Sequence, residues 1–205
     1  MRTILLTFCL FMGTILSAQN NVLIEIENAN AAYKVITGDF VRTQTNVAKG
    51  TSIKADGTLY IVGEDQMAQY YKAPSTDLLI INGNDFYMIR GKKTNKFNTE
   101  KNKTMRSLRN TLLYCVHGKP MELATENGAE ITAEKKENEY EVVLISTKKT
   151  PRGYAKIVLT YDLKSKLLTK MQMDEYNGNS TLYEMNNLKT NGNIDAKVFD
   201  IPEKK

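Results

Sequence analysis

Apolar and polar residues alternate along most of the chain with a period of two, which predicts β-strands. Turn-forming residues separate the alternating stretches, as at 82–84 and 177–179, and predict tight hairpins. Further turns are expected at 54–57 and 164–166. So many short strands predict an antiparallel sheet that is large enough to curl. The ten predicted strands are 36–47, 57–62, 66–72, 77–81, 85–90, 129–135, 139–146, 153–162, 167–176 and 180–188.

The alternation is clearest in the two strands predicted at 153–162 and 167–176. Successive side chains of a strand point to opposite faces of the sheet, so one face here is apolar and the other more polar. Such a face is covered either by helices of the same chain or by a hydrophobic ligand. The positions that define the apolar face are Ala155, Ile157, Leu159, Tyr161, Leu167, Thr169, Met171 and Met173.

Two stretches follow the helical period instead. In 21–34 the apolar residues recur every three or four positions, and in 99–117 they share one face that excludes most of the Lys and Arg residues. Gly118 and Pro120 are expected to end the second helix. The lysine-rich segment 91–103 is predicted to be a mobile loop. The second helix falls between two blocks of strands, and it is expected to cover the concave side of the sheet.

The N-terminus has the pattern of a secretory signal peptide. Arg2 precedes an apolar stretch at 4–16, and Ser17 and Ala18 precede polar residues. A membrane-spanning helix needs about 20 apolar residues, so a cleaved signal peptide at 1–18 is favoured over an anchor. We therefore expect an exported, periplasmic protein.

The rest of the chain has the composition of one globular domain. The full sequence has 205 residues, of which 41% are hydrophobic, and residues 19–205 contain no repeat or Pro- or Gly-rich linker. The net charge of +5 falls by one when Arg2 is removed. Export excludes nucleic acid as a partner, while attraction to anionic membranes or to an acidic donor remains open. Without Cys9 a single cysteine remains, so no internal disulfide forms.

Candidate catalytic groups are scarce. His117 is the only histidine and lies two residues after Cys115, where helical side chains do not face each other, so Cys115 is predicted to be a core residue. Histidine and cysteine are too few for a zinc site, and no nucleotide-binding glycine motif is present. The adjacent acids Glu64 and Asp65 lie at a turn. A pair of catalytic carboxylates of the glycosidase type is left as an alternative for which the sequence offers no support. The sequence predicts a binding protein, not an enzyme, with no metal and no cofactor.

The segment 57–90 contains a Gly-x-Leu strand, an aromatic strand, a proline, an apolar strand and an Asn-Gly hairpin that leads into another aromatic strand. This order resembles the central signature of the LolA-like family of periplasmic outer-membrane lipoprotein carriers. The flanks are similar as well, with an N-terminal helix before Gly38-Asp39-Phe40 and a Phe-x-Ile-Pro end. The matching positions are Gly57, Leu59, Pro74, 78–80, Asn82, Gly83, Tyr87, Phe199, Ile201 and Pro202.

The resemblance implies a mainly β fold of the α+β class, in which a half-open, strongly curved antiparallel sheet or incomplete barrel has helices over its concave face. It also implies a monomeric carrier that takes lipoprotein acyl chains from an inner-membrane release complex to an outer-membrane acceptor, without a cofactor. One departure is that Gly63-Glu64 stands where the family has an Arg-Pro pair whose arginine holds the lid. Tyr60, Gln69 and Tyr87 occupy the family's tryptophan positions.

Strand alternation and the resemblance together predict which residues form the apolar binding cavity. The lid is predicted to be the helix that carries Met105, Leu108, Leu112 and Val116. The alternative is a sensor or interaction domain of the same fold that binds a protein partner or another hydrophobic ligand without lipoprotein transfer. A secreted hydrolase is kept as a third possibility. The predicted cavity residues are Leu59, Ile61, Met67, Tyr71, Leu78, Ile80, Ile157, Leu159, Met171 and Met173.

Overall fold

A computed structural model describes residues 20–75, 77–148 and 153–201, and the predicted signal peptide lies outside these residues. The described chain begins with a helix at residues 20–31, which matches the first predicted helix. Its apolar side is buried through Val22, Leu23 and Ile26. Tyr33, which follows the helix, donates a hydrogen bond to the Ser165 carbonyl at 2.9 Å, so the helix is fixed at the turn between two distant strands. No helix among the described residues is long and apolar enough to cross a membrane.

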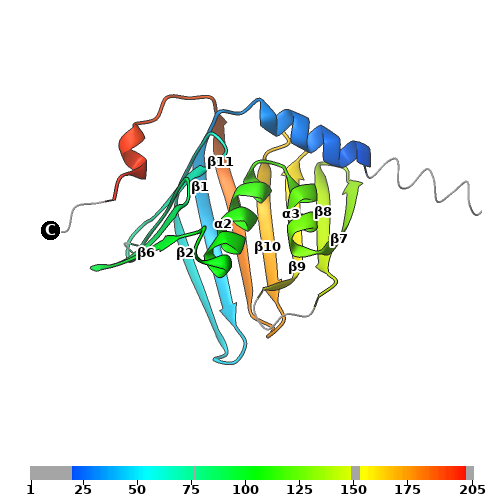
Figure 1. Cartoon of the computed structure of the whole chain (residues 1–205). Helices are drawn as coiled ribbons and strands as arrows, with labels where there is room; N and C mark the ends of the chain where they lie inside the picture. The colour runs from blue at the N-terminus through cyan, green and yellow to red at the C-terminus, as the bar shows by residue number, and fades with distance from the viewer. Residues whose placement is uncertain (1–19, 76, 149–152, 202–205) are drawn as a thin grey trace, which may run out of the picture.

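Eleven strands form one antiparallel sheet that does not close (Figure 1). The strand order is β6-β5-β4-β3-β2-β1-β11-β10-β9-β8-β7, so the first and last strands pair in the middle of the sheet. The sheet curves around helices α2 (Lys103–Val116) and α3 (Pro120–Asn127) (Figure 1). The predicted half-open, mainly β architecture is therefore confirmed. The strands are β1 (Val35–Asn46), β2 (Thr51–Val62), β3 (Gln66–Tyr71), β4 (Leu78–Asn82), β5 (Asp85–Arg90), β6 (Lys93–Asn98), β7 (Ala129–Lys135), β8 (Glu139–Ser146), β9 (Tyr154–Asp162), β10 (Leu168–Glu175) and β11 (Ser180–Thr190).

Two predictions about the first half of the sheet are wrong. The turn expected at 54–57 is part of β2, which pairs with β1 from Thr51 onward, and the chain reverses at 47–50 instead. The loop expected at 91–103 contains β6, which pairs with β5 along its whole length. Both segments are polar and largely exposed, so backbone pairing forms them without an apolar pattern. The lysines of β6 lie on an edge strand, where charge discourages pairing with another chain.

The helical layer also differs from the prediction, because it contains two helices. Asn102 caps α2 by accepting a hydrogen bond from the Met105 N–H at 3.1 Å, so the helix begins later than expected. Gly118 ends it, but Pro120 is the first residue of α3, a position where its missing N–H costs nothing. The two helices lie side by side over the concave face, as Figure 1 shows.

The convex face of the sheet is partly covered by the C-terminal segment. This segment ends in a short 3-10 helix, η1 (Ala196–Phe199), whose Phe199 packs in a second apolar cluster with Ala68, Leu78, Ile80 and Tyr87. The Tyr70 hydroxyl donates a hydrogen bond to the Val198 carbonyl at 2.9 Å. The segment therefore shields an apolar patch that the N-terminal half of the sheet would otherwise expose.

Gly57, which begins the Gly-x-Leu motif inside β2, has no room for a side chain. A Cβ built there would lie 2.2 Å from the Tyr70 carbonyl oxygen and 2.7 Å from the Phe40 ring. We predict that Gly57→Ala lowers the free energy of unfolding by about 1–3 kcal/mol, the usual cost of overpacking. Gly192→Ala is the control, since nothing lies within 4 Å of its Cβ, and it should change stability by less than about 0.5 kcal/mol. Urea unfolding of both variants measures this, and equal stabilities would contradict it.

Candidate functional site

The concave face of the sheet and the helices above it form the main apolar cluster of the protein. Most of the predicted cavity residues lie in this cluster, together with Met105, Leu112 and Val116 of the predicted lid. Leu108 is partly buried at its margin. The predicted cavity residues found there are Leu59, Ile61, Met67, Tyr71, Ile157, Leu159, Met171 and Met173.

Leu78 and Ile80 are placed on the wrong face by the prediction. They belong to the convex cluster under η1, while their neighbour Ile81 is buried on the concave side. Four apolar residues follow one another in this strand, so the sequence contains no alternation from which to choose a face. Pairing decides it, since Ile81 is opposite Met67 and Ile80 opposite Ala68.

Several concave-face residues are absent from the prediction. Phe86 of β5 and Met185 of β11 are buried in the main cluster, as are Leu113 of α2 and Leu123 of α3. The signal for Phe86 is the Asn-Gly hairpin, which pairs β5 with β4 and sets Phe86 opposite Ile81. Leu123 could be found only by recognising a second helix, and the signal for that helix is Pro120 at its first position.

In the closed arrangement of the described chain, the helices fill the concave face. The space left between α2 and the central strands is about 10 Å³, which is room for about one water molecule. It is too small for an acyl chain. The residues around it are Ile36, Leu59, Ile61, Val116, Leu167, Leu168, Met185 and Leu188.

A larger cleft opens at one end of the helical layer, between α2, the end of α3 and strands β7 to β10. Its volume is about 660 Å³, within the usual range for small-molecule sites. Its apolar wall includes Leu108, Leu144, Tyr154 and Ile157, which also contact or belong to the main cluster. Burial raises the pKa of the Tyr154 hydroxyl, so this side chain is neutral at physiological pH. The cleft therefore leads directly into the apolar interior.

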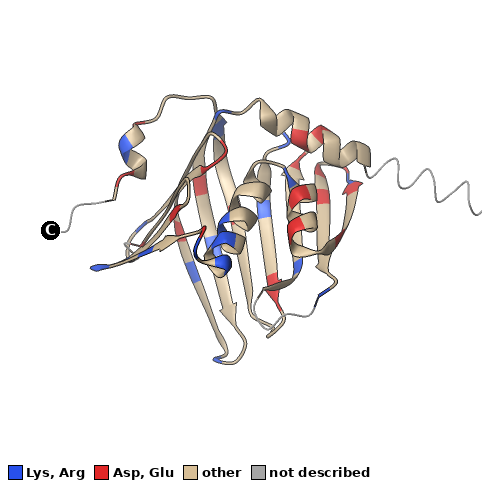
Figure 2. Ribbon diagram, viewed as in Figure 1, with Lys and Arg blue, Asp and Glu red and all other residues tan. Residues whose placement is uncertain are grey.

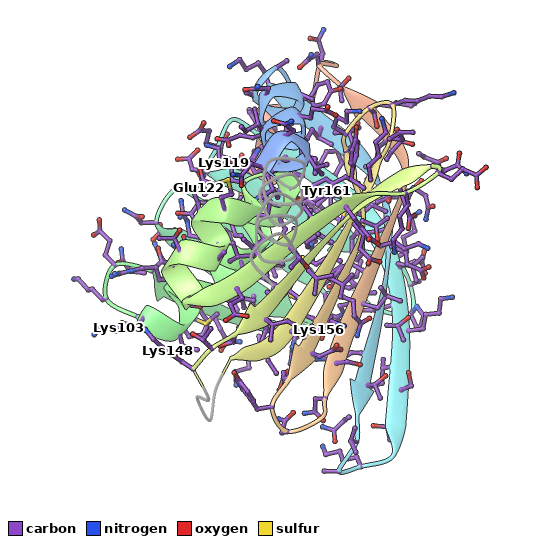
Figure 3. The ribbon with its side chains drawn as sticks, turned by 90° about the vertical axis from the view of Figure 1, so that its right-hand side faces the viewer. Lys103, Lys119, Glu122, Lys148, Lys156 and Tyr161 are labelled. Atoms are coloured by element: carbon purple, nitrogen blue, oxygen red, sulfur yellow. The ribbon has the colours of Figure 1, made fainter. Side chains whose placement is uncertain are left out.

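Charged groups surround the mouth of this cleft. Lys103 of α2 and Lys148, which follows β8, both line it, and Figure 3 shows them at the same end of the helices. Glu126 and Glu175 also line it; Glu126 accepts hydrogen bonds from Asn110 and Glu175 accepts one from Asn177. An apolar interior with a charged mouth is suited to a molecule that has a hydrocarbon part and a polar head.

A small number of polar contacts hold the two helices to the sheet. The Arg109 Nε donates a hydrogen bond to the Gly83 carbonyl at 2.7 Å, and the Tyr161 hydroxyl donates one to the Cys115 carbonyl at 2.9 Å. At the junction of α2 and α3, the Lys119 ammonium contacts the Glu64 carboxylate at 3.0 Å. These contacts fix the middle and the C-terminal end of α2, and its junction with α3, over the apolar face.

Glu64 lies in the turn where the resemblance places an arginine that holds the lid. Here the turn carries an acid, and the residue that it contacts at the α2–α3 junction is a lysine. The hydrogen bond from Lys119 lowers the pKa of the Glu64 carboxyl. Glu64 is 81% exposed, so the pair contributes little to stability, although it still joins the turn to the lid.

Cys115 and His117 lie near that junction, and both are buried. Burial raises the pKa of the Cys115 thiol well above its ordinary value, so the thiol is protonated and a poor nucleophile. Burial, assisted by Lys119, lowers the pKa of His117 to about 4, and its Nε2 has no hydrogen-bond partner among the described residues. His117 is therefore a neutral, buried residue at the junction of α2 and α3.

The neutral state of His117 predicts a dependence of stability on pH. The ordinary histidine pKa is 6.5, so between pH 4 and pH 6.5 the unfolded chain binds a proton that the folded protein does not. The contribution is complete above pH 6.5 and is lost as the pH falls toward 4. We expect the free energy of unfolding to drop by about 1–2 kcal/mol from pH 7 to pH 5. His117→Gln should remove this drop, and urea unfolding at both pH values measures it. An equal loss in both proteins would show that other groups cause it.

Comparisons with known proteins identify the family and the fold. The family model described as outer membrane lipoprotein carrier protein LolA matches residues 31–202. No curated protein has a matching sequence.

Solved structures of similar fold include an uncharacterised conserved protein from Thermus thermophilus, with 10% identity, a TM-score of 0.54 and coverage of 91% of this chain and 95% of that one. A crystal structure of MucB has 13% identity and a TM-score of 0.51, with coverage of 92% of this chain and 64% of that one. A LolA superfamily protein from Nitrosomonas europaea has 9% identity and a TM-score of 0.45, with coverage of 90% and 98%. At these identities the similarity extends to the fold alone. Because the family model covers most of the sequence, the chain belongs to the LolA family of outer-membrane lipoprotein carrier proteins.

Proposed function

We propose that this protein is a periplasmic carrier that holds lipoprotein acyl chains, or a related lipid, between the concave face of its sheet and the lid formed by α2 and α3. In this proposal it receives its cargo from an inner-membrane release complex and delivers it to an outer-membrane acceptor. The observation that carries the proposal is the cleft of about 660 Å³, because its walls continue into the apolar cluster beneath the lid. No covalent step is required.

The free energy of burying the lid side chains is similar in size to that of burying an acyl chain. Five large apolar side chains of α2 and α3 are buried against the sheet, and at about 2 kcal/mol each they contribute about 10 kcal/mol to lid closure. An acyl chain with about 14 CH2 groups gains about 11 kcal/mol when it leaves water, at about 0.8 kcal/mol per CH2. An acyl chain can therefore offset the free energy that the lid loses on opening. The side chains counted are Met105, Leu112, Leu113, Val116 and Leu123.

The cleft offers a route for this exchange. Leu108 lies on α2 where the cleft meets the main cluster, and Ile157 lies below it on β9. A chain that enters beside Leu108 meets apolar surface at each step and displaces α2 progressively. This avoids exposing the whole concave face to water at once.

The alternative function is a sensor or interaction domain that binds a protein partner. A groove on the convex face supports it, since Tyr60, Ile194 and Val198 line a space of about 890 Å³ between the sheet and the C-terminal segment. A partner that displaced this segment would reach the second apolar cluster. In that case the convex face, and not the cleft, would carry the function.

We predict that Leu108→Gln weakens binding of a fluorescent fatty acid by about fivefold or more, because it places an amide on the apolar wall of the cleft. Met121→Gln is the matched control, since Met121 is 44% exposed on α3 and does not line the cleft. The measurement is a fluorescence titration, together with lipid extraction and mass spectrometry of protein purified from the periplasm.

The same experiments distinguish the two functions. Co-purified acyl-chain amphiphile and a selective loss of probe binding in Leu108→Gln support the carrier. Absence of any bound amphiphile, together with failure to accept a lipoprotein from inner-membrane vesicles, contradicts it. If the Leu108→Gln variant loses probe binding but still functions in cells, a protein partner on the convex face is favoured.

A further inference from the structure

The positive charge of this protein is concentrated in one short segment. Residues 90–109 contain eight Lys and Arg residues and a single acid, Glu100. The net charge of this segment exceeds the +5 of the whole chain, so the remaining sequence is net negative. A basic surface on an otherwise acidic protein has a directional field, whatever the overall charge.

The fold keeps these residues along one margin of the molecule. The segment runs from the end of β5 through the edge strand β6 and into the first turns of α2. Figure 2 shows basic residues at the free tip of the β5–β6 hairpin and again on the lower turns of α2. Within the described chain no further strand covers β6, because it is the last strand of the sheet.

Half of the basic residues already have partners. Lys96 pairs with Asp85 at 2.8 Å, and Arg90 lies 4.0 Å from Asp77. Arg106 and Arg109 donate hydrogen bonds to backbone carbonyls. These four residues help to hold the hairpin and α2 in place.

The other four are Lys92, Lys93, Lys101 and Lys103, which we call the basic edge. All four are exposed, and within the described ranges no carboxylate oxygen lies within 4.0 Å of their ammonium groups. Lys103 also lines the mouth of the cleft. One residue of the basic edge therefore lies at the entrance to the apolar interior.

We propose that the basic edge docks the protein on a membrane surface that contains anionic phospholipid, with the mouth of the cleft facing the headgroups. Flexible lysine side chains spread along a strand and a helix suit a layer of mobile phosphates, because each ammonium acts as a point charge. An acidic protein partner would favour bidentate arginine contacts, and the arginines here are engaged with the chain itself. Each lysine near such a membrane contributes a factor of about five to binding.

The test is sedimentation of the purified protein with vesicles, either of phosphatidylcholine alone or of phosphatidylcholine mixed with phosphatidylglycerol. The variant combines Lys92→Gln, Lys93→Gln, Lys101→Gln and Lys103→Gln. The control removes the same charge elsewhere through Lys54→Gln, Lys156→Gln, Lys164→Gln and Lys170→Gln, all at exposed positions. Thermal unfolding of each variant confirms that it is folded.

We expect the protein to bind the mixed vesicles at low salt, to release them at high salt, and to ignore phosphatidylcholine alone. The basic-edge variant should bind at least about tenfold more weakly, while the control variant keeps most of the affinity. Equal losses in the two variants would overturn the proposal, because net charge and not position would then be responsible. Absence of binding to the mixed vesicles would overturn it as well. This assay uses protein without acyl cargo, so its failure would leave the carrier function to be judged by the lipid-binding experiments.

Discussion

The concave face of the sheet is apolar from β5 to β8, and an open sheet cannot bury such a face by itself. Among the described residues, the N-terminal helix, α2 and α3 separate it from water. The rest of the structure follows from this requirement. The amphipathic face of α2, its Asn102 cap and the contacts at the α2–α3 junction all serve to keep a cover over that surface. This cover is a separate layer that is attached mainly by side chains. A hydrophobic ligand could take its place over the sheet.

The way the cover is attached is consistent with such an exchange. The apolar contacts of α2 and α3 are extensive, but their polar contacts with the strands and turns of the described chain are few. One of these contacts, the Glu64–Lys119 pair, has an exposed carboxylate. Exposed ion pairs cost little free energy to break. Exposing a buried apolar side chain to water costs about 2 kcal/mol, unless another apolar group takes over its contacts. In the proposed carrier, the lid is therefore stable in water and can be replaced by hydrocarbon. The difference between water and hydrocarbon comes from the hydrophobic effect, and no specific polar contact is needed to hold the lid closed.

The sequence predicts those parts of the fold whose periodicity reflects burial. The predicted strands from β7 to β11 match the structure almost residue by residue, because one side of each is buried and the other is not. β6 is absent from the prediction because its polar residues join the sheet through backbone bonds alone. Leu78 and Ile80 are wrongly assigned to the cavity because four consecutive apolar residues carry no information about the face. The contact of Glu64 with Lys119 joins residues 55 positions apart, and no local pattern signals it.

The two ends of the lid have different surroundings. At the α2–α3 junction His117 is buried and neutral and Lys119 is paired, so this end presents little free charge. At the other end, Lys103 in the first turn of α2 lines the cleft, and Lys101 just before α2 is exposed. A charged surface would therefore act on the end where the apolar interior is accessible. If the cover is exchanged for hydrocarbon, the exchange begins at the cleft end of α2, because Leu108 there is already only partly buried while Val116 at the far end is almost fully enclosed.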